Sequence, residues 1–317
     1  PATICIDGNR SFPVPKVFAQ EKMNKAKVYN RLLEQLEGKE QTKPIREGFY
    51  LEKDGKISHA TTPQTILMHN AVDDEVQRPT TDVVGVYSRE AIKAGTILKG
   101  EIRFRNLQID FSKLKSKVRI GTSKKDSGLS EIKFGKVDNF KPKSVSKENQ
   151  LVVYLASDVM LRNDKLRQTN LVSDLAKAIG LDEKTKADFQ QIQVRRIESW
   201  QTGWGFPRPT LTLMQAGSVV RFETTDEITL AKLQEIEKEG IGERRGEGYG
   251  QVIFNPTILE KKGVLETGES EQNKLVWEKK EAAKAENPTA TGEIKEVKFA
   301  KLIEETAWRE EIKLAVS

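Results

Sequence analysis

The chain has 317 residues, of which 37% are hydrophobic and 32% charged, and it carries a formal net charge of +6. This length suffices for two domains with cores of their own, and the mild positive charge favours an anionic partner. One cysteine, Cys5, and two histidines, His59 and His69, exclude a disulfide framework and a zinc site of cysteine or histidine ligands built within the chain. No cofactor is expected.

The sequence also lacks the patterns of membrane insertion and export. Its longest apolar runs, such as 151–156, fall far short of the roughly 20 residues that a membrane-spanning helix needs. No signal-peptide pattern is found. We therefore expect no membrane partner and a cytoplasmic, reducing location.

The first half of the chain predicts an extended segment, one helix and several short strands. Residues 1–20 contain two prolines and read as an extended lead-in. A helix is predicted over 21–36, because Val28, Leu32, Leu33 and Leu36 recur at helical spacing. Strands are predicted at 48–51, 83–87, 95–104 and 129–134, followed by a linker rich in Lys, Ser and Pro at 135–149.

The second half gives clearer signals. A helix from Asn170 to Gly180 and another over 227–239, ended by Gly240, are predicted from apolar spacing and terminal residues. The order of elements is β-α-β-β-α-β, the split βαβ or ferredoxin-like arrangement. One face of such a sheet is free of helices, and RNA-recognition modules bind RNA on it. Strands are predicted at 151–155, 191–198, 210–214, 217–223 and 251–254, with an extra hairpin near Trp200.

Two stretches about 121 residues apart have nearly the same pattern. The first is Ala94-Gly95-Thr96, followed after 26 residues by Ile120-Gly121. The second is Ala216-Gly217-Ser218, followed after 25 residues by Ile241-Gly242. The repeat predicts two copies of one structural unit. We therefore expect an α+β fold with ferredoxin-like domains at 1–140 and 150–256, and a charged, partly helical C-terminal extension at 257–317.

Each copy ends in a loop that combines glycines with a pair of basic residues. The first loop (121–128) contains Lys124, Lys125 and Gly128, and the second loop (240–250) contains Arg244 and Arg245 among five glycines. Glycine lets a backbone approach phosphates closely, and arginine binds phosphate oxygens through paired hydrogen bonds. The Gly-Lys-Ser/Thr ending of an ATP-binding loop is missing. The alternative is a pair of tight turns that dock a helix on its sheet.

Two further features favour a nucleic-acid partner. Residues 113–147 contain eleven Lys or Arg and three acidic residues, although such a run is also typical of a solvated loop. The segment 200–208 combines Trp204 and Arg208, which suit stacking on bases and contact with phosphates. A tryptophan in the core and another covering a hairpin would explain the same residues.

The motif Gly-x-Gly-Glu-x-Arg-Gly-x-Gly-x-Gly-x-Val at 240–252 resembles the glycine-rich loop of the RAMP proteins of CRISPR-Cas systems, whose domains are ferredoxin-like. The stretches His69–Asp73, Leu155–Asp158 and Ala216–Val219 are similar to segments of type III effector subunits. Together, over about 45–255, they most resemble the subunit of type III-D effectors that holds the 5′ handle of the guide RNA.

The resemblance implies a non-catalytic subunit that binds the handle and caps one end of the effector. Its protein partners would be the large polymerase-like subunit and the backbone RAMP subunits. The expected RNA-binding residues are Gly242, Arg244, Arg245, Gly246, Gly248 and Tyr249 of the second loop, Lys124, Lys125 and Gly128 of the first loop, and Trp204 and Arg208.

Three alternatives stay open from the sequence. Asp73 and Asp74 could hold a divalent metal for target RNA cleavage, as an acidic residue does in backbone relatives. His59 or His69 could serve a guide-processing endoribonuclease. The chain could also be a scaffold whose loops contact only protein.

Overall fold

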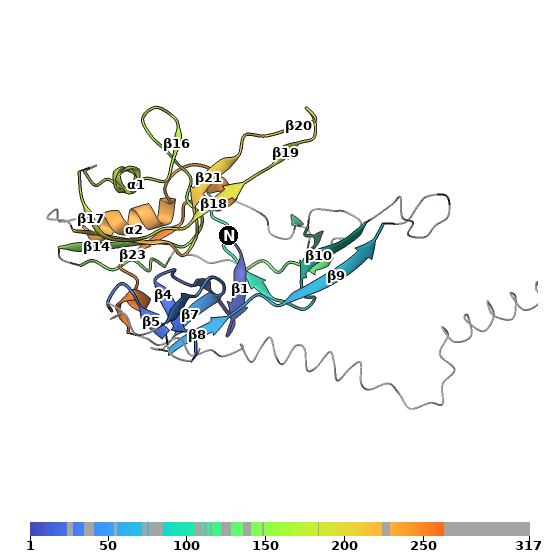
Figure 1. Ribbon diagram of the computed structural model, residues 1–317, viewed down its shortest axis with the longest axis horizontal. Coiled ribbons are helices and arrows are strands. Elements are labelled where there is room, and N and C mark those ends of the chain that lie inside the picture. Colours follow the sequence, from blue (N-terminus) through green and yellow to red (C-terminus); the bar gives the residue numbers. More distant parts are fainter. Residues whose placement is uncertain are drawn as a thin grey trace, which may run out of the picture. The chain divides into compact units, whose positions relative to one another are not determined.

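Figure 1 shows the computed structural model of the chain, which divides into two units, residues 1–273 and 274–317. All described residues belong to the first unit. Within them, no helix combines the length and the apolar character that crossing a membrane requires. The structure describes residues 1–23, 28–34, 41–53, 56–71, 75, 85–104, 110, 113–114, 116–121, 128–135, 141–147, 149–182, 184–223 and 229–262.

The first half of the described chain consists of small antiparallel sheets. Their strand orders are β11-β1-β2, β3-β7-β8 and β5-β4-β6, and two further pairs are the hairpins β9–β10 and β12–β13. The strands are β1 (Thr3–Ile6), β2 (Asn9–Arg10), β3 (Phe12–Pro13), β4 (Phe18–Glu21), β5 (Val28–Asn30), β6 (Thr42–Pro44), β7 (Phe49–Lys53), β8 (Lys56–Ala60), β9 (Gln64–Asn70), β10 (Val86–Ile92), β11 (Leu98–Lys99), β12 (Lys117–Arg119) and β13 (Leu129–Glu131).

The second half contains one four-stranded antiparallel sheet of order β17-β22-β14-β23 and three two-stranded pairs, β15–β16, β18–β21 and β19–β20. The elements are β14 (Gln150–Leu155), β15 (Leu161–Arg162), β16 (Gln168–Thr169), α1 (Val172–Ala178), β17 (Ala187–Gln191), β18 (Val194–Ile197), β19 (Trp200–Gln201), β20 (Phe206–Pro207), β21 (Leu211–Met214), β22 (Val219–Glu223), α2 (Leu230–Glu239), β23 (Val252–Phe254) and the 3₁₀ turns Arg245–Glu247 and Thr257–Glu260.

Local residues explain where α2 begins and ends, whereas the start of α1 differs from the predicted one. Thr229 caps α2 by accepting a hydrogen bond from the Lys232 amide, and Gly240 ends the helix at φ +73°. The predicted cap of α1, Asn170, is not used. Helix α1 begins after Leu171 without a side-chain cap, while Thr169 Oγ1 accepts from the Leu171 amide and donates to Asp174.

Both faces of the four-stranded sheet are covered. Strand β14 alternates: Leu151, Val153 and Leu155 pack into the core beneath α1 and α2, while Val152 and Tyr154 pack into a second core. Figure 1 shows the helices on one side of the sheet and β4, β5 and β7 on the other. That second core also contains Val14, Val17, Phe18, Val28, Leu32, Tyr50, Ile57, Ala156, Val219, Ile253, Ile258 and Leu259.

The prediction of a free sheet face for RNA is therefore wrong. Each fully buried apolar side chain contributes roughly 1.5–3 kcal/mol to folding, so this face is closed by a stable core and not by a loosely attached segment. The Tyr154 hydroxyl also donates to the Pro13 carbonyl oxygen at 2.5 Å across the same interface.

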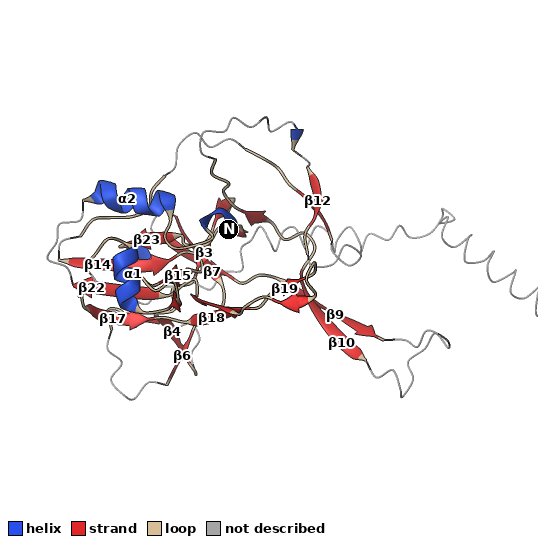
Figure 2. Cartoon of the chain, turned by 90° about the horizontal axis from the view of Figure 1, so that it is seen from above, coloured by secondary structure: helices blue, strands red, loops and turns tan. Residues whose placement is uncertain are grey.

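The prediction of two ferredoxin-like domains is also wrong. In the part of the chain that the structure describes, α1 and α2 are the α-helices, and both belong to the second half; the rest is mainly strands in small sheets (Figure 2). Instead of the predicted helix at 21–36, Val28–Asn30 forms β5 and pairs with β4. Four apolar residues at helical spacing were too short a pattern, and Leu33 is 41% exposed. In the predicted C-terminal extension, residues 263–317 lie outside the described residues.

Part of the predicted linker has an ordered place beside β23. The Glu237 carboxylate accepts hydrogen bonds from the Lys143 and Ser144 amides and from Ser144 Oγ, at 2.6–3.0 Å. The Val145 amide donates to the Phe254 carbonyl oxygen at 3.0 Å. Residues 143–145 therefore lie against β23 and α2 without forming a strand, and the predicted domain boundaries stay a prediction.

Candidate nucleic-acid interface

The second loop connects the end of α2 to β23. Both ends of the loop pack closely against backbone atoms of the same protein and form hydrogen bonds with them. A Cβ at Gly242 would overlap the Met160 carbonyl oxygen, and one at Gly250 would overlap that of Ile241. The Ile241 amide donates to Gly250 O at 2.9 Å, and the Glu243 amide donates to Met160 O at 2.9 Å. For Gly242 and Gly250, close packing within the protein thus explains the glycine.

The middle of the second loop faces open space. Arg244 adopts a left-handed conformation, φ +54°, and leads into the 3₁₀ turn Arg245–Glu247. A Cβ added at Gly246 would meet no atom within 4 Å. Gly248 has φ +93° and lies beside Pro1. Close packing within the protein does not explain Gly246, which leaves room there for an outside chain.

Arg244 is paired within the loop. Its guanidinium donates two hydrogen bonds to the Glu247 carboxylate, one of them at 2.7 Å, and lies 5.3 Å from the Tyr249 ring centre. These bonds raise the pKa of Arg244 and lower that of Glu247. Arg208 lowers the pKa of Glu247 further by its charge. The second loop and the segment 200–208 therefore lie within electrostatic range of each other.

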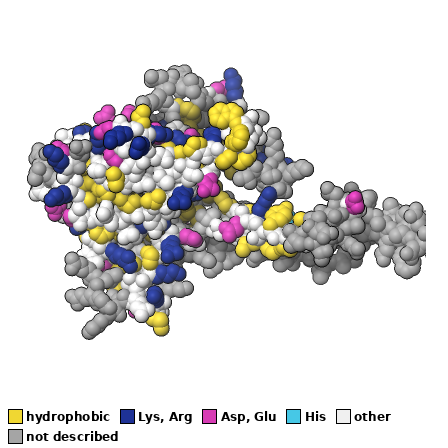
Figure 3. Space-filling view, turned by 45° about the horizontal axis from the view of Figure 1, so that its top comes forward, with side chains coloured by type: hydrophobic (Ala, Val, Ile, Leu, Met, Phe, Trp, Pro, Cys, Tyr) yellow, Lys and Arg dark blue, Asp and Glu magenta, His cyan; other side chains and the backbone are white. Residues whose placement is uncertain are grey.

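Other cations near the second loop also have acidic partners. Arg162 Nε lies 2.6 Å from Glu243 Oε1, and Arg195 lies 3.3 Å from Asp158. Arg245 donates to the Gly240 carbonyl oxygen at 3.3 Å and lies 3.9 Å from Glu239. An incoming phosphate would compete with carboxylates for these groups. Figure 3 shows Lys and Arg side chains interspersed with Asp and Glu on one face.

The hairpin β19–β20, called here the aromatic hairpin, exposes its aromatic side chains. Trp200, Trp204 and Phe206 are 61%, 77% and 69% exposed. Arg208, just beyond the hairpin, donates to Gln201 Oε1 with its Nε at 3.1 Å. Neither tryptophan is a core residue, so of the two interpretations of 200–208 the structure favours an exposed surface.

The first loop is only partly described. Lys124 and Lys125 lie outside the described residues, while Gly128 is exposed, and a Cβ there would meet no atom within 4 Å. The structure therefore gives no geometry in which these residues join the second loop.

The candidate catalytic residues do not form a site among the described residues. Asp73 and Asp74 lie outside them. His69 stacks on Tyr87 with ring centres 5.1 Å apart, and burial lowers the pKa of His59, which packs against Gly48. Within the described ranges, no three His, Cys, Asp or Glu side chains come close enough to hold a metal ion.

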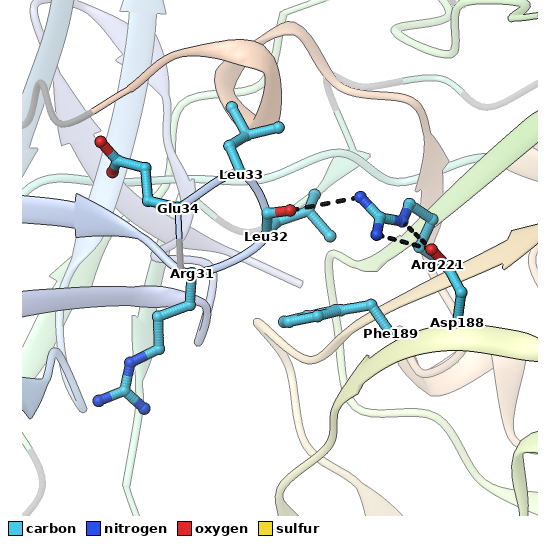
Figure 4. Close-up of a pocket in the computed structure, with 7 residues that line it drawn as sticks. All are labelled: Arg31, Leu32, Leu33, Glu34, Asp188, Phe189 and Arg221. Atoms are coloured by element: carbon cyan, nitrogen blue, oxygen red, sulfur yellow. Dashed lines mark hydrogen bonds and ion pairs between the residues drawn. The ribbon is translucent and has the colours of Figure 1, made fainter. Parts of the chain in front are cut away.

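A pocket of about 670 Å³ was not anticipated from the sequence (Figure 4). Its lining combines residues 31–34, after β5, with Asp188, Phe189 and Arg221 of the sheet. Arg221 is held by Asp188 at 2.6 Å and donates to the Leu32 carbonyl oxygen at 3.3 Å. These segments are far apart in the sequence, and no local pattern marks them. Because Asp188 neutralises Arg221, the pocket wall offers little net charge to a ligand.

Comparison with known proteins adds no relative. No protein-family model matches this sequence, and a search of curated proteins gives no match. The resemblance to RAMP proteins therefore depends on the motif residues alone.

Proposed function

We propose that this chain binds single-stranded RNA on a surface formed by the middle of the second loop and the aromatic hairpin. The observation that carries the proposal is that the aromatic hairpin exposes Trp200, Trp204 and Phe206, while the middle of the second loop, with its two arginines, is open at Gly246. Exposed aromatic rings stack on unpaired bases, and arginines bind the phosphates between them.

The closed sheet face restricts how RNA could bind. Val152 and Tyr154 are buried under the first half of the chain, so bases cannot stack on that face as they do in RNA-recognition modules. The remaining route uses loops and hairpins, where Gly246 leaves open space beside two arginines.

We further propose that the RNA is the 5′ handle of a guide RNA, bound by a non-catalytic subunit of a type III, most nearly type III-D, CRISPR effector. That subunit would cap the complex and contact the large polymerase-like subunit and the backbone RAMP subunits. This more specific proposal is supported by the loop motif at 240–252 and by the similar stretches at 155–158 and 216–219.

The test is RNA affinity measured over a salt series, with a handle RNA and a scrambled RNA of equal length. Arg244→Ala with Arg245→Ala should weaken binding and make the slope of log K against log salt shallower by about 0.7 for each lost phosphate contact. Gly246→Leu should weaken binding without changing the unfolding midpoint, because its side chain would occupy open space.

The control is Lys184→Gln with Lys186→Gln, two exposed positions next to β17 at the far edge of the sheet. Unchanged handle affinity of the double arginine variant at two salt concentrations would contradict the RNA surface. Equal affinity of the wild type for handle and scrambled RNA would contradict the handle assignment but leave RNA binding in place.

A further inference from the structure

A small hollow lies beside the base of the second loop, and we call it the Arg10 hollow. It has a volume of about 40 Å³, more than the roughly 10–15 Å³ that one water requires and too little for a whole nucleotide. Its charged lining consists of four cations, Arg10, Arg103, Lys141 and Lys143, and two carboxylates, Glu101 and Glu237. The lining therefore has an excess of positive charge.

The two carboxylates already have partners. Glu237 accepts from the Lys143 and Ser144 amides and from Ser144 Oγ. Glu101 lies 3.6 Å from Arg10 and 3.4 Å from Arg103. These contacts leave the side-chain ammonium groups of Lys141 and Lys143 without an ion pair among the described residues.

The charged end of Lys143 lies close to the hollow. Its Nζ is 4.9 Å from the ring centre of Phe12, which also lines the hollow. Glu52 has other partners: against the effect of its burial, hydrogen bonds from Lys261 and Thr257 lower its pKa, and the charge of Lys143 adds to that lowering.

Arg10 is mostly buried and has an unused donor. Its side chain is 11% exposed, and its Nη2 donates to Gln251 Oε1 at 2.8 Å. Its Nε has no hydrogen-bond partner in the described structure. Burial lowers the pKa of Arg10, Glu101 opposes that shift, and the charge of Arg103 adds to it. A buried, incompletely bonded guanidinium is costly, and an oxyanion would satisfy it.

The hollow lies beside both ends of the second loop, whose middle is part of the surface proposed for RNA. Gln251, which lines it, directly follows Gly250 of the second loop. Arg103 donates to the carbonyl oxygens of Glu237 and Lys238 at the end of α2, at 3.4 and 2.6 Å, next to Gly240 where the loop begins.

We propose that the Arg10 hollow binds one phosphate group of the RNA chain held by the second loop. The proposal rests on the RNA-binding function proposed above and adds a phosphate subsite to it. The Arg10 guanidinium would contribute positive charge to the wall of the hollow, and Lys141 and Lys143 would neutralise the phosphate.

The experiment compares the full chain with Lys141→Gln/Lys143→Gln, using the control Lys184→Gln/Lys186→Gln, which removes the same charge at the opposite edge of the sheet. These lysines are used because Arg10→Gln could disturb folding. RNA affinity is measured over a salt series, and binding of inorganic phosphate is measured in parallel. We expect a slope shallower by about 0.7 in the lysine variant and an unchanged slope in the control.

The outcomes separate this subsite from the RNA surface. A slope equal to that of the wild type, while Arg244→Ala/Arg245→Ala still weakens binding, would overturn the hollow and keep the RNA surface. A second outcome is that the wild type binds inorganic phosphate but no RNA, and that the lysine variant loses the phosphate binding. That result would overturn the RNA assignment and leave a site for free phosphate. The proposal would also be overturned if the lysine variant lost affinity for an acidic peptide but kept its affinity for RNA.

Discussion

The turns at 93–96 and 215–218 have the same geometry in two very different surroundings. In each, the last residue donates to the carbonyl oxygen three positions earlier, with its amide at 3.2 Å and its hydroxyl at 2.7 Å. Gly95 and Gly217 both have φ +89°, the conformation that a type II turn requires of its third residue.

The chain after the two turns differs. The turn of Gly217 is packed against the N-terminal segment, where the Lys16 amide donates to Gly217 O at 2.7 Å, and it leads into β22 in the centre of a four-stranded sheet. The turn of Gly95 leads into the two-residue strand β11, which, within the described part of the chain, pairs with β1 alone. Two similar short sequences, Ala-Gly-Thr and Ala-Gly-Ser, therefore produce the same turn, while the fold around each turn depends on the apolar residues that follow.

The largest expected effect concerns the strands after the turns. Phe222→Ala, in β22, should lower the free energy of unfolding by about 3–5 kcal/mol, because Phe222 is fully buried. Leu98→Ala, in β11, should lower it by less than about 1 kcal/mol, because Leu98 is 41% exposed. Urea unfolding of both variants measures the difference, and similar losses would mean that the strand after the first turn also belongs to a core.

A smaller difference is expected at the last residue of each turn. Ser218 is fully buried, and its hydroxyl also accepts from the Gln193 amide at 3.1 Å, so Ser218→Ala should cost about 1–3 kcal/mol. Thr96→Ala should cost about 0.5–1 kcal/mol, because that side chain is only partly buried. Thermal unfolding provides the comparison. Equal costs would show that the surroundings of the turns matter less than their internal bonds.

The smallest effect is expected on RNA affinity. Glu247→Gln should raise affinity for the handle RNA by about twofold to fivefold, because an exposed ion pair is weak and its loss frees Arg244 for phosphate. Glu235→Gln, on the exposed side of α2, changes the charge equally and should do less. A fall in affinity for Glu247→Gln would mean that Glu247 holds Arg244 in its binding position.

The elements predicted best were those with strong local signals. The apolar run at 151–155 is β14, and Gly180 and Gly240 follow the two helices at φ +81° and +73°. The closed sheet face was predictable from the sequence, because a continuous run of Leu, Val, Val, Tyr and Leu is typical of a strand buried on both faces. In the first half, the strands are short and pair over long distances, as β1 does with β11, so local periodicity carried little information.

By itself, the sequence determined the two glycine turns, the C-terminal ends of both helices and the glycine-rich character of the second loop, because each depends on backbone conformations set by neighbouring residues. Only the tertiary structure decided that the second sheet face is covered, that the charge of Arg208 acts on Glu247, and that Arg10, Arg103 and Lys143 line one hollow. Those results depend on packing between segments about 40 or more residues apart, and no local pattern encodes which distant surfaces meet.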